Sequence, residues 1–213
     1  MHDEFWQLLQ NQPGVGVLII DIDGSVVFCN EQSRQIYYGG QFDPVGKTIE
    51  EIEGPEFASE RMPLIREVIR TGVPIQIRHI RGGRNTESMI WPMREVEGQK
   101  RRIIAITRQG IDDVEPGVAY RVIESRLVDL GPLDVLTRRE LEVMALIGHG
   151  IPFKTIASML GVTLRTIERY RTDIARKLHV ATLAEIACLV QAAGLESTDA
   201  SLTRIRRWQG NTD

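Results

Sequence analysis

Residues 136–178 read LTRRELEVMALIGHGIPFKTIASMLGVTLRTIERYRTDIARKL, and their pattern predicts the helices in the C-terminal part of the chain. Glu140 follows Thr137 by three positions, which is the spacing of a capping box. In that motif the Thr hydroxyl caps a backbone N–H and the Glu side chain bonds back to the capping residue. Apolar residues recur at helical spacing from Leu141 until Gly150 stops the pattern, so we predict a helix here.

Two further helices are predicted directly after Gly150. The first is short, with Ile156 and Leu160 on its inner side, and it ends at the turn Gly161-Val162. Thr163 is suited to cap the second, longer helix. The apolar stripe of the longer helix consists of Ile167, Tyr170, Ile174 and Leu178. A short helix, a tight turn and a longer helix occur in the order of a helix-turn-helix motif.

The other face of the longer helix is polar and mostly basic. Its members are Arg165, Glu168, Arg169, Arg171, Thr172, Arg176 and Lys177. Arg can donate two hydrogen bonds to guanine, and Arg, Lys and Thr can all bind phosphate groups. A solvated helix face would carry similar residues, but the helix-turn-helix order favours DNA binding.

The stretch from residue 136 to residue 195 resembles the LuxR-type (or GerE-type) DNA-binding domain. The resemblance rests on Leu136-Thr137, Arg139-Glu140, Glu142-Val143, Gly150, Lys154, Ile156-Ala157, Leu160, Thr166-Ile167, Arg171, Lys177-Leu178 and Ala193-Gly194-Leu195. It implies a bacterial source and a domain of four helices. The third helix would enter the major groove, and the fourth, Thr182–Ala193, commonly pairs two subunits in this family.

The resemblance also implies roles for individual residues. The residues that would face base edges are Glu168, Arg169 and Thr172, and those that would hold the DNA backbone are Lys154, Arg165, Thr166, Arg171 and Lys177. The sequence departs from the family at Tyr170, where His is usual, and at Glu168, where Lys is often found. A Glu can accept a hydrogen bond from cytosine N4, so the departures predict an unusual operator preference.

Residues 1–110 have a different character. A short helix opens the chain, and VGVLIID and VVFCN flank an Asp23-Gly24 turn, which is a strong hairpin signal. Helical patterns follow in 31–39 and 55–72, and then the three strand-like segments PIQIRHI, ESMIWPMREV and RRIIAITR. Two strands, helices and three strands give an α+β order with one antiparallel sheet.

This order resembles a PAS domain over about residues 3–109. The resemblance rests on Val17–Ile20, Asp23-Gly24, Val26-Val27, Asn30, the helix to Gly39, Gly46-Lys47 and the later helix and strands. It implies a five-stranded antiparallel sheet with helices on one face. Many such domains enclose a small cavity, and many dimerise.

We identify no cofactor from the sequence. Cys29 lacks the surrounding motif of a flavin photosensor, and no His lies in 55–72, where a haem sensor commonly has its ligand. An unknown small ligand and a cavity-free dimerisation module stay open as alternatives. We interpret His79 as a surface or hydrogen-bonded His, and Trp91 as a core aromatic with a cavity wall as the alternative.

Residues 17–24, VLIIDIDG, also allow an enzyme hypothesis, because they resemble the signature of haloacid-dehalogenase-like phosphatases. In that hypothesis Asp21 is the nucleophile. A degenerate receiver domain is a related alternative, and a partner-binding adaptor is a third. The phosphatase fold and the receiver fold both need parallel strands, which are joined by crossover helices. The consecutive strands after residue 73 disfavour them, so we expect no catalytic residues.

The remaining expectations concern organisation and partners. We predict a PAS-like domain at 1–110, a linker at 111–135, the helix-turn-helix domain at 136–195 and a polar tail at 196–213; residues 119–130 fit either a strand or a helix. Cys29 and Cys188 lie too far apart for a zinc spacing, and we expect both in the core and no metal site. MHDEFWQLLQ is no signal peptide and no apolar run is long enough to span a membrane. We therefore expect a cytoplasmic homodimer that binds double-stranded DNA under a small-molecule or protein signal.

Overall fold

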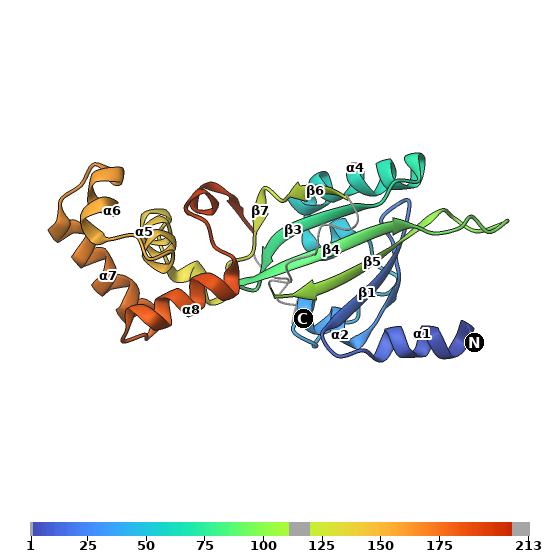
Figure 1. The fold of residues 1–213 in the computed structure, drawn as a ribbon. Helices are drawn as coiled ribbons and strands as arrows, with labels where there is room; N and C mark the ends of the chain where they lie inside the picture. Colours follow the sequence, from blue (N-terminus) through green and yellow to red (C-terminus); the bar gives the residue numbers. More distant parts are fainter. Residues whose placement is uncertain (1, 111–119, 206–213) are drawn as a thin grey trace. The chain divides into compact units, whose positions relative to one another are not determined.

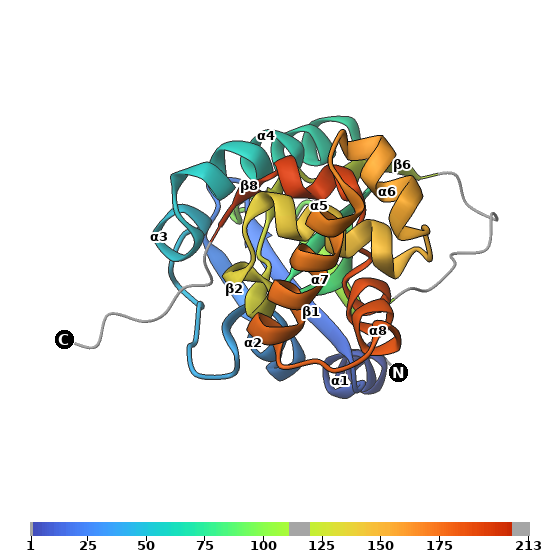
Figure 2. The same cartoon turned by 90° about the vertical axis from the view of Figure 1, so that its left-hand side faces the viewer.

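A computed structural model describes residues 2–110 and 120–205 (Figures 1 and 2). The chain divides into two compact units. The first takes up the chain to residue 79 and from 86 to 125, and the second consists of 80–85 and 126–204. The fold class is α+β, with a sheet and helices in the first unit and a bundle of helices in the second.

The first unit is built on a sheet with the strand order β2-β1-β5-β4-β3-β6. Its strands are β1 Val15–Asp21, β2 Val26–Cys29, β3 Ile75–Arg81, β4 Arg84–Pro92, β5 Arg102–Gln109 and β6 Arg121–Glu124. The helices are α1 His2–Asn11, α2 Glu31–Tyr38, α3 Ile49–Glu53 and α4 Pro55–Thr71. The helices α2, α3 and α4 cover one face of the sheet (Figure 1).

The predicted hairpin forms as expected around Asp23-Gly24. β1 pairs antiparallel with β2 on one side and with β5 on the other. Gly24 takes a positive φ of 94°, and the Asp23 carboxylate accepts a hydrogen bond from the Ser25 backbone N–H. A hydrogen bond from Lys100 holds the pKa of Asp23 at about 2. Asp23 therefore serves the turn and stays ionised.

Asn30 joins this hairpin to α2. Its side-chain oxygen accepts hydrogen bonds from the Val17 N–H at 2.8 Å and from the Ser33 N–H at 2.9 Å, and its amide donates to Val15 O at 2.9 Å. The same buried side chain therefore caps α2 at its N-terminus. It also bonds the backbone N–H and C=O groups of β1 in the way that a neighbouring strand would. This dual role explains why a short polar residue interrupts the apolar run at this point.

The sheet has one strand more than predicted. β6 pairs with β3, and it runs parallel to it, so the sheet is mixed. Further along the chain, β7 Leu127–Val128 pairs in parallel with β8 Thr203–Arg204, which lies in the predicted tail. The open choice for 119–130 is thereby settled as strand for 121–124 and 127–128, while 111–119 lies outside the described residues.

The second unit contains the helices expected from residues 136–195. These are α5 Arg138–Gly148, α6 Phe153–Leu160, α7 Leu164–Leu178 and α8 Leu183–Ala193, with short 3₁₀ turns η1 Gly131–Val135 and η2 Ser197–Ser201 on either side. Both partners of the predicted capping box at Thr137 and Glu140 make their bonds. The core includes Leu141, Ile156, Ile167, Ile174 and Ile186, all of them fully buried.

The turn between β3 and β4 belongs to the second unit. The Asp129 carboxylate accepts a hydrogen bond from the Gly82 N–H, and the Asp129 backbone bonds to Ile80 and to Gly83. Arg81 is only 1% exposed, and its Nε lies 3.7 Å from the Asp129 carboxylate. A Cβ on Gly83 would stand 2.7 Å from Leu130 O. Only glycine therefore allows the two segments to approach this closely.

No helix in the described part of the chain is long and apolar enough to cross a membrane.

Candidate functional site

The helix α7 presents two faces of opposite chemistry. Ile167 and Ile174 are fully buried, and Tyr170 and Leu178 are half-buried and pack against the same core. Thr163 caps the helix by accepting a hydrogen bond from the Thr166 N–H at 3.2 Å. Gly161, with a φ of 65°, makes the tight turn that separates α6 from α7. Short helix, turn and capped long helix therefore form the predicted helix-turn-helix.

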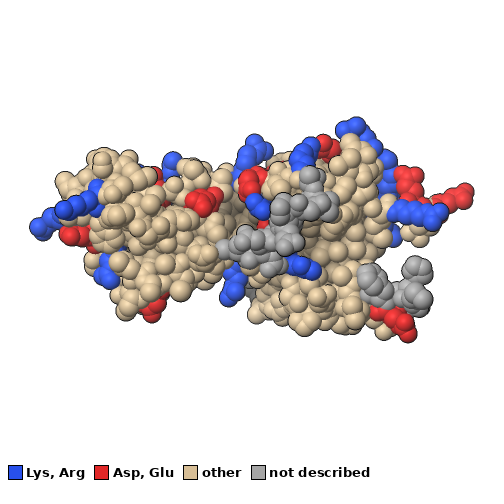
Figure 3. Space-filling view, in the orientation of Figure 1, with Lys and Arg blue, Asp and Glu red and all other residues tan. Residues whose placement is uncertain are grey.

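The outward face of α7 carries four side chains at its N-terminal half: Arg165, Glu168, Arg169 and Thr172. All four are exposed, and with Thr163 and Thr166 they line one shallow hollow in the surface. Lys and Arg side chains are also visible on this unit in the space-filling view (Figure 3). An exposed helix face with a basic and polar first half is suited to contact base edges and phosphates in a DNA groove.

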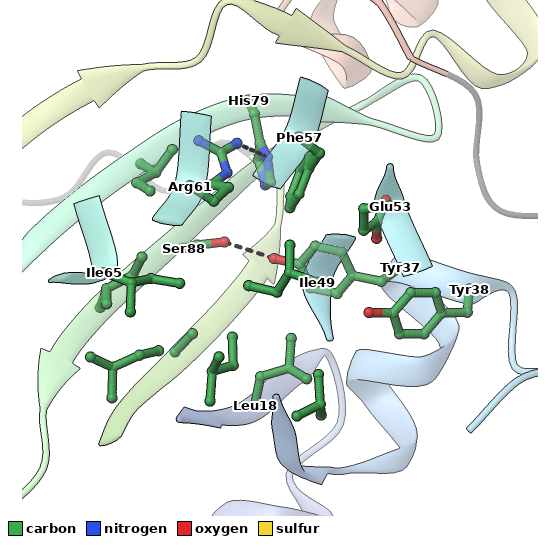
Figure 4. Close-up of a pocket in the computed structure, with 16 residues that line it drawn as sticks. Leu18, Tyr37, Tyr38, Ile49, Glu53, Phe57, Arg61, Ile65, His79 and Ser88 are labelled. Carbon is green, nitrogen blue, oxygen red and sulfur yellow. Dashed lines mark hydrogen bonds between the residues drawn. The ribbon is translucent and has the colours of Figure 1, made fainter. Parts of the chain in front are cut away.

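The first unit contains a cavity of about 50 Å³ between the sheet and the helices α2 to α4 (Figure 4). Most of its wall is aliphatic, from Leu18 and Ile20 on β1, Ile65 on α4, Ile77 on β3 and Ile103 on β5. At one side Tyr37 Oη lies 3.0 Å from Ser88 Oγ and 3.0 Å from Thr107 Oγ1. The wall thus combines an apolar surface with a small group of hydroxyls.

A second polar group lies elsewhere on the same wall. Arg61 and His79 both line the cavity, and Arg61 Nη2 is 3.0 Å from His79 Nδ1. Arg61 is 5% exposed and His79 is 8% exposed, so this is a buried polar pair. Figure 4 shows the two side chains side by side, above the aliphatic wall. His79 is therefore the hydrogen-bonded histidine of the sequence interpretation.

Comparison with known families gives two matches within the chain. Residues 134–190 match the luxR family of bacterial regulatory proteins, and residues 11–109 match the PAS fold. The chain joins a PAS domain to a LuxR-type DNA-binding domain. The family of the C-terminal domain is one of transcription regulators and not of enzymes.

Curated relatives match less than half of the chain. FixJ of Azorhizobium caulinodans is 36% identical over 64 residues, which are 30% of this chain and 30% of that protein. ExaE of Pseudomonas putida is 38% identical over 63 residues, or 30% of this chain and 29% of that protein. The chain thus spans about 30% of the length of these relatives.

Solved structures cover more of the chain at lower similarity. VqmA of Vibrio cholerae, solved in a complex with a ligand and DNA, is 19% identical, covers 92% of this chain and 90% of its own, and gives a TM-score of 0.49. The PAS domain of BvgS from Bordetella pertussis is 20% identical, covers 54% of this chain and 90% of its own, and gives 0.41.

The residues predicted to hold the DNA backbone fall into two groups in the LuxR-type domain. Lys154 and Arg165 are exposed, and Thr166 is half-buried at the start of α7. Arg171 instead donates to Ala181 O at 3.1 Å, beside the start of α8, and Lys177 lies 2.6 Å from the Glu140 carboxylate. Arg171 and Lys177 thus already hold the domain together, and their DNA contacts stay predictions.

The base-facing set has its own internal contacts. Thr172 Oγ1 donates to the backbone oxygen of Glu168 at 3.0 Å, so this bond does not involve the Glu168 carboxylate, and Glu168 is exposed. The Arg169 guanidinium lies 5.9 Å from the centre of the Tyr170 ring. Tyr170, half-buried where the family usually has His, packs on the core, as its place in the predicted apolar stripe implies.

The PAS domain lacks the arrangement that the phosphatase hypothesis requires. Asp21 lies on a strand whose two neighbours are both antiparallel, and its carboxylate accepts a hydrogen bond from Arg102 at 2.7 Å. Within the described ranges, no group of three or more His, Cys, Asp or Glu side chains is placed to hold a metal ion. The Asp21 carboxylate thus bonds to β5, and the Asp23 carboxylate serves the β1–β2 turn.

The two cysteines and Trp91 lie in different surroundings. Cys29 is buried, and burial raises the pKa of its thiol to about 12. Cys188 is exposed on α8, so the expectation of two core cysteines was wrong for it: Ile186 and Val190 take the buried face of that helix. Trp91 lines a groove with Met89 and Tyr120 that is separate from the cavity.

The lining of the cavity is what sequence reasoning missed. Tyr37, Arg61 and Ser88 come from α2, α4 and β4, and none belongs to a motif. One signal was available, because Arg61 interrupts the apolar face of the predicted helix between Ala58 and Met62. A charged residue on the buried face of an amphipathic helix requires a partner, and here the partners lie in and beside the cavity wall.

Proposed function

We propose that this chain is a one-component transcription regulator, in which a small molecule bound in the PAS domain controls how the LuxR-type domain binds operator DNA. The observation that carries the proposal is the exposed face of α7, Arg165, Glu168, Arg169 and Thr172, on a capped helix-turn-helix in the same chain as a PAS domain with an internal cavity. Such a regulator acts in the bacterial cytoplasm.

In this proposal α7 lies in the major groove and three of its side chains contact bases. Arg169 donates two hydrogen bonds to a guanine, and Glu168 accepts one from a cytosine amino group. Thr172 completes the set. Lys154, Arg165 and Thr166 bind phosphates, which fixes the position of the helix on the duplex. The mixed charge of Glu168 and Arg169 supports a preference for a G·C-containing site.

Selection of bound DNA from a random pool tests this function directly. A dimer that places one α7 in each half-site selects a pseudo-palindrome whose half-sites are about one helical turn apart. The full chain should therefore enrich such a motif, with competition by random duplex far weaker than by the selected sequence. A pool that stays random, at a salt concentration where the protein still binds, would contradict sequence-specific regulation.

The dimer itself is proposed to form through α8. Leu183 is 45% exposed and Cys188 is exposed, on a helix that carries only one charged side chain, Glu185. Because Cys29 is buried with a raised thiol pKa, Cys188 is the thiol that a reagent can reach. A short bismaleimide should link two subunits through Cys188, and Cys188→Ser should abolish the link. Light scattering that shows a monomer with and without operator DNA would overturn the dimer.

The cavity supports a small molecule as the signal, in preference to a protein. Its wall is mostly aliphatic, its volume is about 50 Å³, and Arg61 and His79 on it are buried, so the space suits a small molecule better than a segment of protein. A pull-down partner that depends on the PAS domain alone would support the adaptor alternative. Binding of a small molecule that changes operator affinity would support the sensor.

A further inference from the structure

Four polar side chains form one connected group at an end of the PAS cavity. Arg61 and His79 line the cavity, and Glu60 and Ser125 lie next to them. Arg61 Nη2 bonds to His79 Nδ1 at 3.0 Å and to Ser125 Oγ at 3.2 Å. Ser125 Oγ donates to the Glu60 carboxylate at 2.8 Å, and Arg61 Nη1 lies 2.8 Å from the same carboxylate. We call these four residues the Arg61 cluster.

The place of the Arg61 cluster in the chain is unusual. His79 and Ser125 are the last residues of the PAS unit on two segments that both continue into the second unit. The two segments are joined at this point, because the Ser125 N–H donates to Arg78 O at 2.9 Å. Within the second unit the same two segments stay joined by the bond from the Asp129 N–H to Ile80 O. A change at the cluster therefore acts on the backbone that leads to the DNA-binding domain.

The chemistry of the Arg61 cluster restricts the ligand. Arg61 supplies N–H donors and no acceptor, so it selects a hydrogen-bond acceptor. Its positive charge is already balanced by the Glu60 carboxylate, which lies 2.8 Å from Nη1. An added ion would bring an unpaired charge into a mostly aliphatic cavity.

The size of the cavity restricts the ligand further. Its volume is about 50 Å³. Because one water-sized group needs on the order of 10–15 Å³ of such volume, there is room for roughly three to five of them. A compact neutral carbonyl compound fits the limits of charge and size best.

We propose that Arg61 binds the carbonyl oxygen of a small neutral ligand, and that Ser125 passes the change on to the segment entering the LuxR-type domain. This inference rests on the proposed function and assigns the ligand class and the route of its regulation. Without ligand, one nitrogen of Arg61 serves both His79 and Ser125. When that nitrogen turns to a carbonyl in the cavity, the Ser125 hydroxyl loses its bond to Arg61. The backbone at 124–126 then relaxes, and with it the start of the second unit.

A substitution at Ser125 distinguishes binding of the ligand from the effect of the ligand on DNA binding. Ser125 belongs to the Arg61 cluster but does not line the cavity. Ser125→Ala should bind the ligand with unchanged affinity and lose the effect of the ligand on DNA binding. Ser88→Ala should do the reverse, because Ser88 lines the cavity, where its hydroxyl bonds to Tyr37, but does not belong to the Arg61 cluster. Ser33→Ala, which removes a fully buried hydroxyl elsewhere in the PAS domain, is the matched control and should change neither property.

The test uses the full chain, its selected operator and three probes of equal size: butan-2-one, propanoate and butylammonium. Saturation-transfer NMR measures binding, and a DNA titration with and without probe measures the response. Butan-2-one should bind best of the three probes. Its dissociation constant should be micromolar or weaker, because the binding free energy available from so few atoms is limited. It should change operator affinity by roughly 5- to 150-fold, the usual range of coupling between sites.

Each outcome bears on one part of the inference. A protein that selects no operator contradicts the proposed function itself. If operator binding is intact but butan-2-one does not bind at millimolar concentration, or binds no better than propanoate, the ligand class is wrong. If Ser125→Ala keeps the full wild-type response to butan-2-one, or loses affinity for it as Ser88→Ala does, the role of Ser125 is wrong.

Discussion

The α7 surface and the PAS cavity assemble function in opposite ways. The α7 residues lie between positions 165 and 172 on a single helix, and they point to solvent. The cavity residues come from positions 18 to 105, on several strands and helices, and most are buried. The first site is local and exposed, while the second exists only when the whole domain has folded.

Function can therefore be separated from stability at the α7 surface but not in the PAS cavity. A side chain on the exposed face of a helix contributes little to folding, so its removal affects binding alone. A cavity wall is also a hydrophobic core, and a change there alters binding and stability together.

The largest effect is expected from Ile103→Ala in the cavity wall. Ile103 is fully buried. Truncating such an Ile costs about 2–5 kcal/mol of unfolding free energy. Ile104→Ala, one position along β5 and half-buried on the other face, should cost much less. Urea titrations followed by circular dichroism measure both, and equal losses for the two variants would mean that the cavity wall is not the core of the PAS domain.

Glu140→Ala is expected to act next most strongly, on the second unit. It deletes the capping box and the carboxylate that lies 2.6 Å from Lys177 Nζ. The loss of these bonds should cost about 1–3 kcal/mol. Burial by itself would raise the pKa of Glu140, but hydrogen bonds from Lys177 and Thr137 outweigh it and lower the pKa below the ordinary 4.5. The unfolded chain therefore binds the proton more readily, so the stabilisation is complete above pH 4.5 and disappears as pH falls through the lowered value.

Unfolding curves of Glu140→Ala and wild type between about pH 3 and 7 should therefore converge at the acid end, where Glu140 is protonated in both states. Asp173→Ala is the control, because its pair with Arg176 is exposed. An exposed pair of this kind is worth at most about 1 kcal/mol. A difference between Glu140→Ala and wild type that does not change with pH would show that packing, and not the ionised carboxylate, supplies the stability.

Arg169→Ala should reduce discrimination between operator and random DNA by about 1–3 kcal/mol, the value of a bidentate contact to guanine. Its unfolding free energy should stay within about 0.5 kcal/mol of wild type, as for other exposed substitutions. Arg176→Ala, on the same helix with a side chain 70% exposed, should keep full discrimination. Unchanged discrimination in Arg169→Ala would remove Arg169 from the base-contacting set.

Lys154→Ala should weaken operator and random DNA alike. A lost phosphate contact lowers the slope of log affinity against log salt by about one unit and leaves sequence preference unchanged. Anisotropy titrations at several salt concentrations give the slope. A loss confined to the operator would instead make Lys154 a base contact.

The smallest effect is expected at the acidic pair that suggested an enzyme. Wild type and Asp21→Asn should both release phosphate from a model ester at the background rate in the presence of magnesium. Turnover by wild type that Asp21→Asn abolishes would reopen the phosphatase hypothesis.

Local patterns predicted much of the fold. Capping boxes, helical periodicity and the Asp-Gly turn depend on neighbouring residues, so α5 to α8 and the β1–β2 hairpin were predictable. β6 was not, because its exposed strand pairs in parallel with β3 through backbone bonds that leave no pattern in its side chains. The prediction for Cys188 was wrong because it relied on how often cysteines are buried in general. The exposure of Cys188 depends instead on which face of α8 carries it.

The two sites differ in the same way, because one depends on neighbouring residues and the other on residues far apart in the sequence. The α7 face could be listed from helical spacing and the family resemblance, although the spacing did not reveal that Arg171 and Lys177 have partners inside the domain. The Arg61 cluster joins residues 60 and 125, and such a contact depends on the sheet topology. Sequence patterns mark a charged residue in an apolar stripe, but they do not identify its partner.

The β3–β4 turn has a consequence for how this protein could have arisen. The second unit needs residues 80–85, because Ile80 fills its core and Arg81 and the two glycines close on the segment around Asp129. A gene fragment beginning at residue 111 or 136 would encode the LuxR-type helices without that turn. We therefore expect exchange of the helices alone, at a point between residues 111 and 135, to remove the Ile80 side chain from their core, which favours inheritance of the PAS hairpin together with its effector.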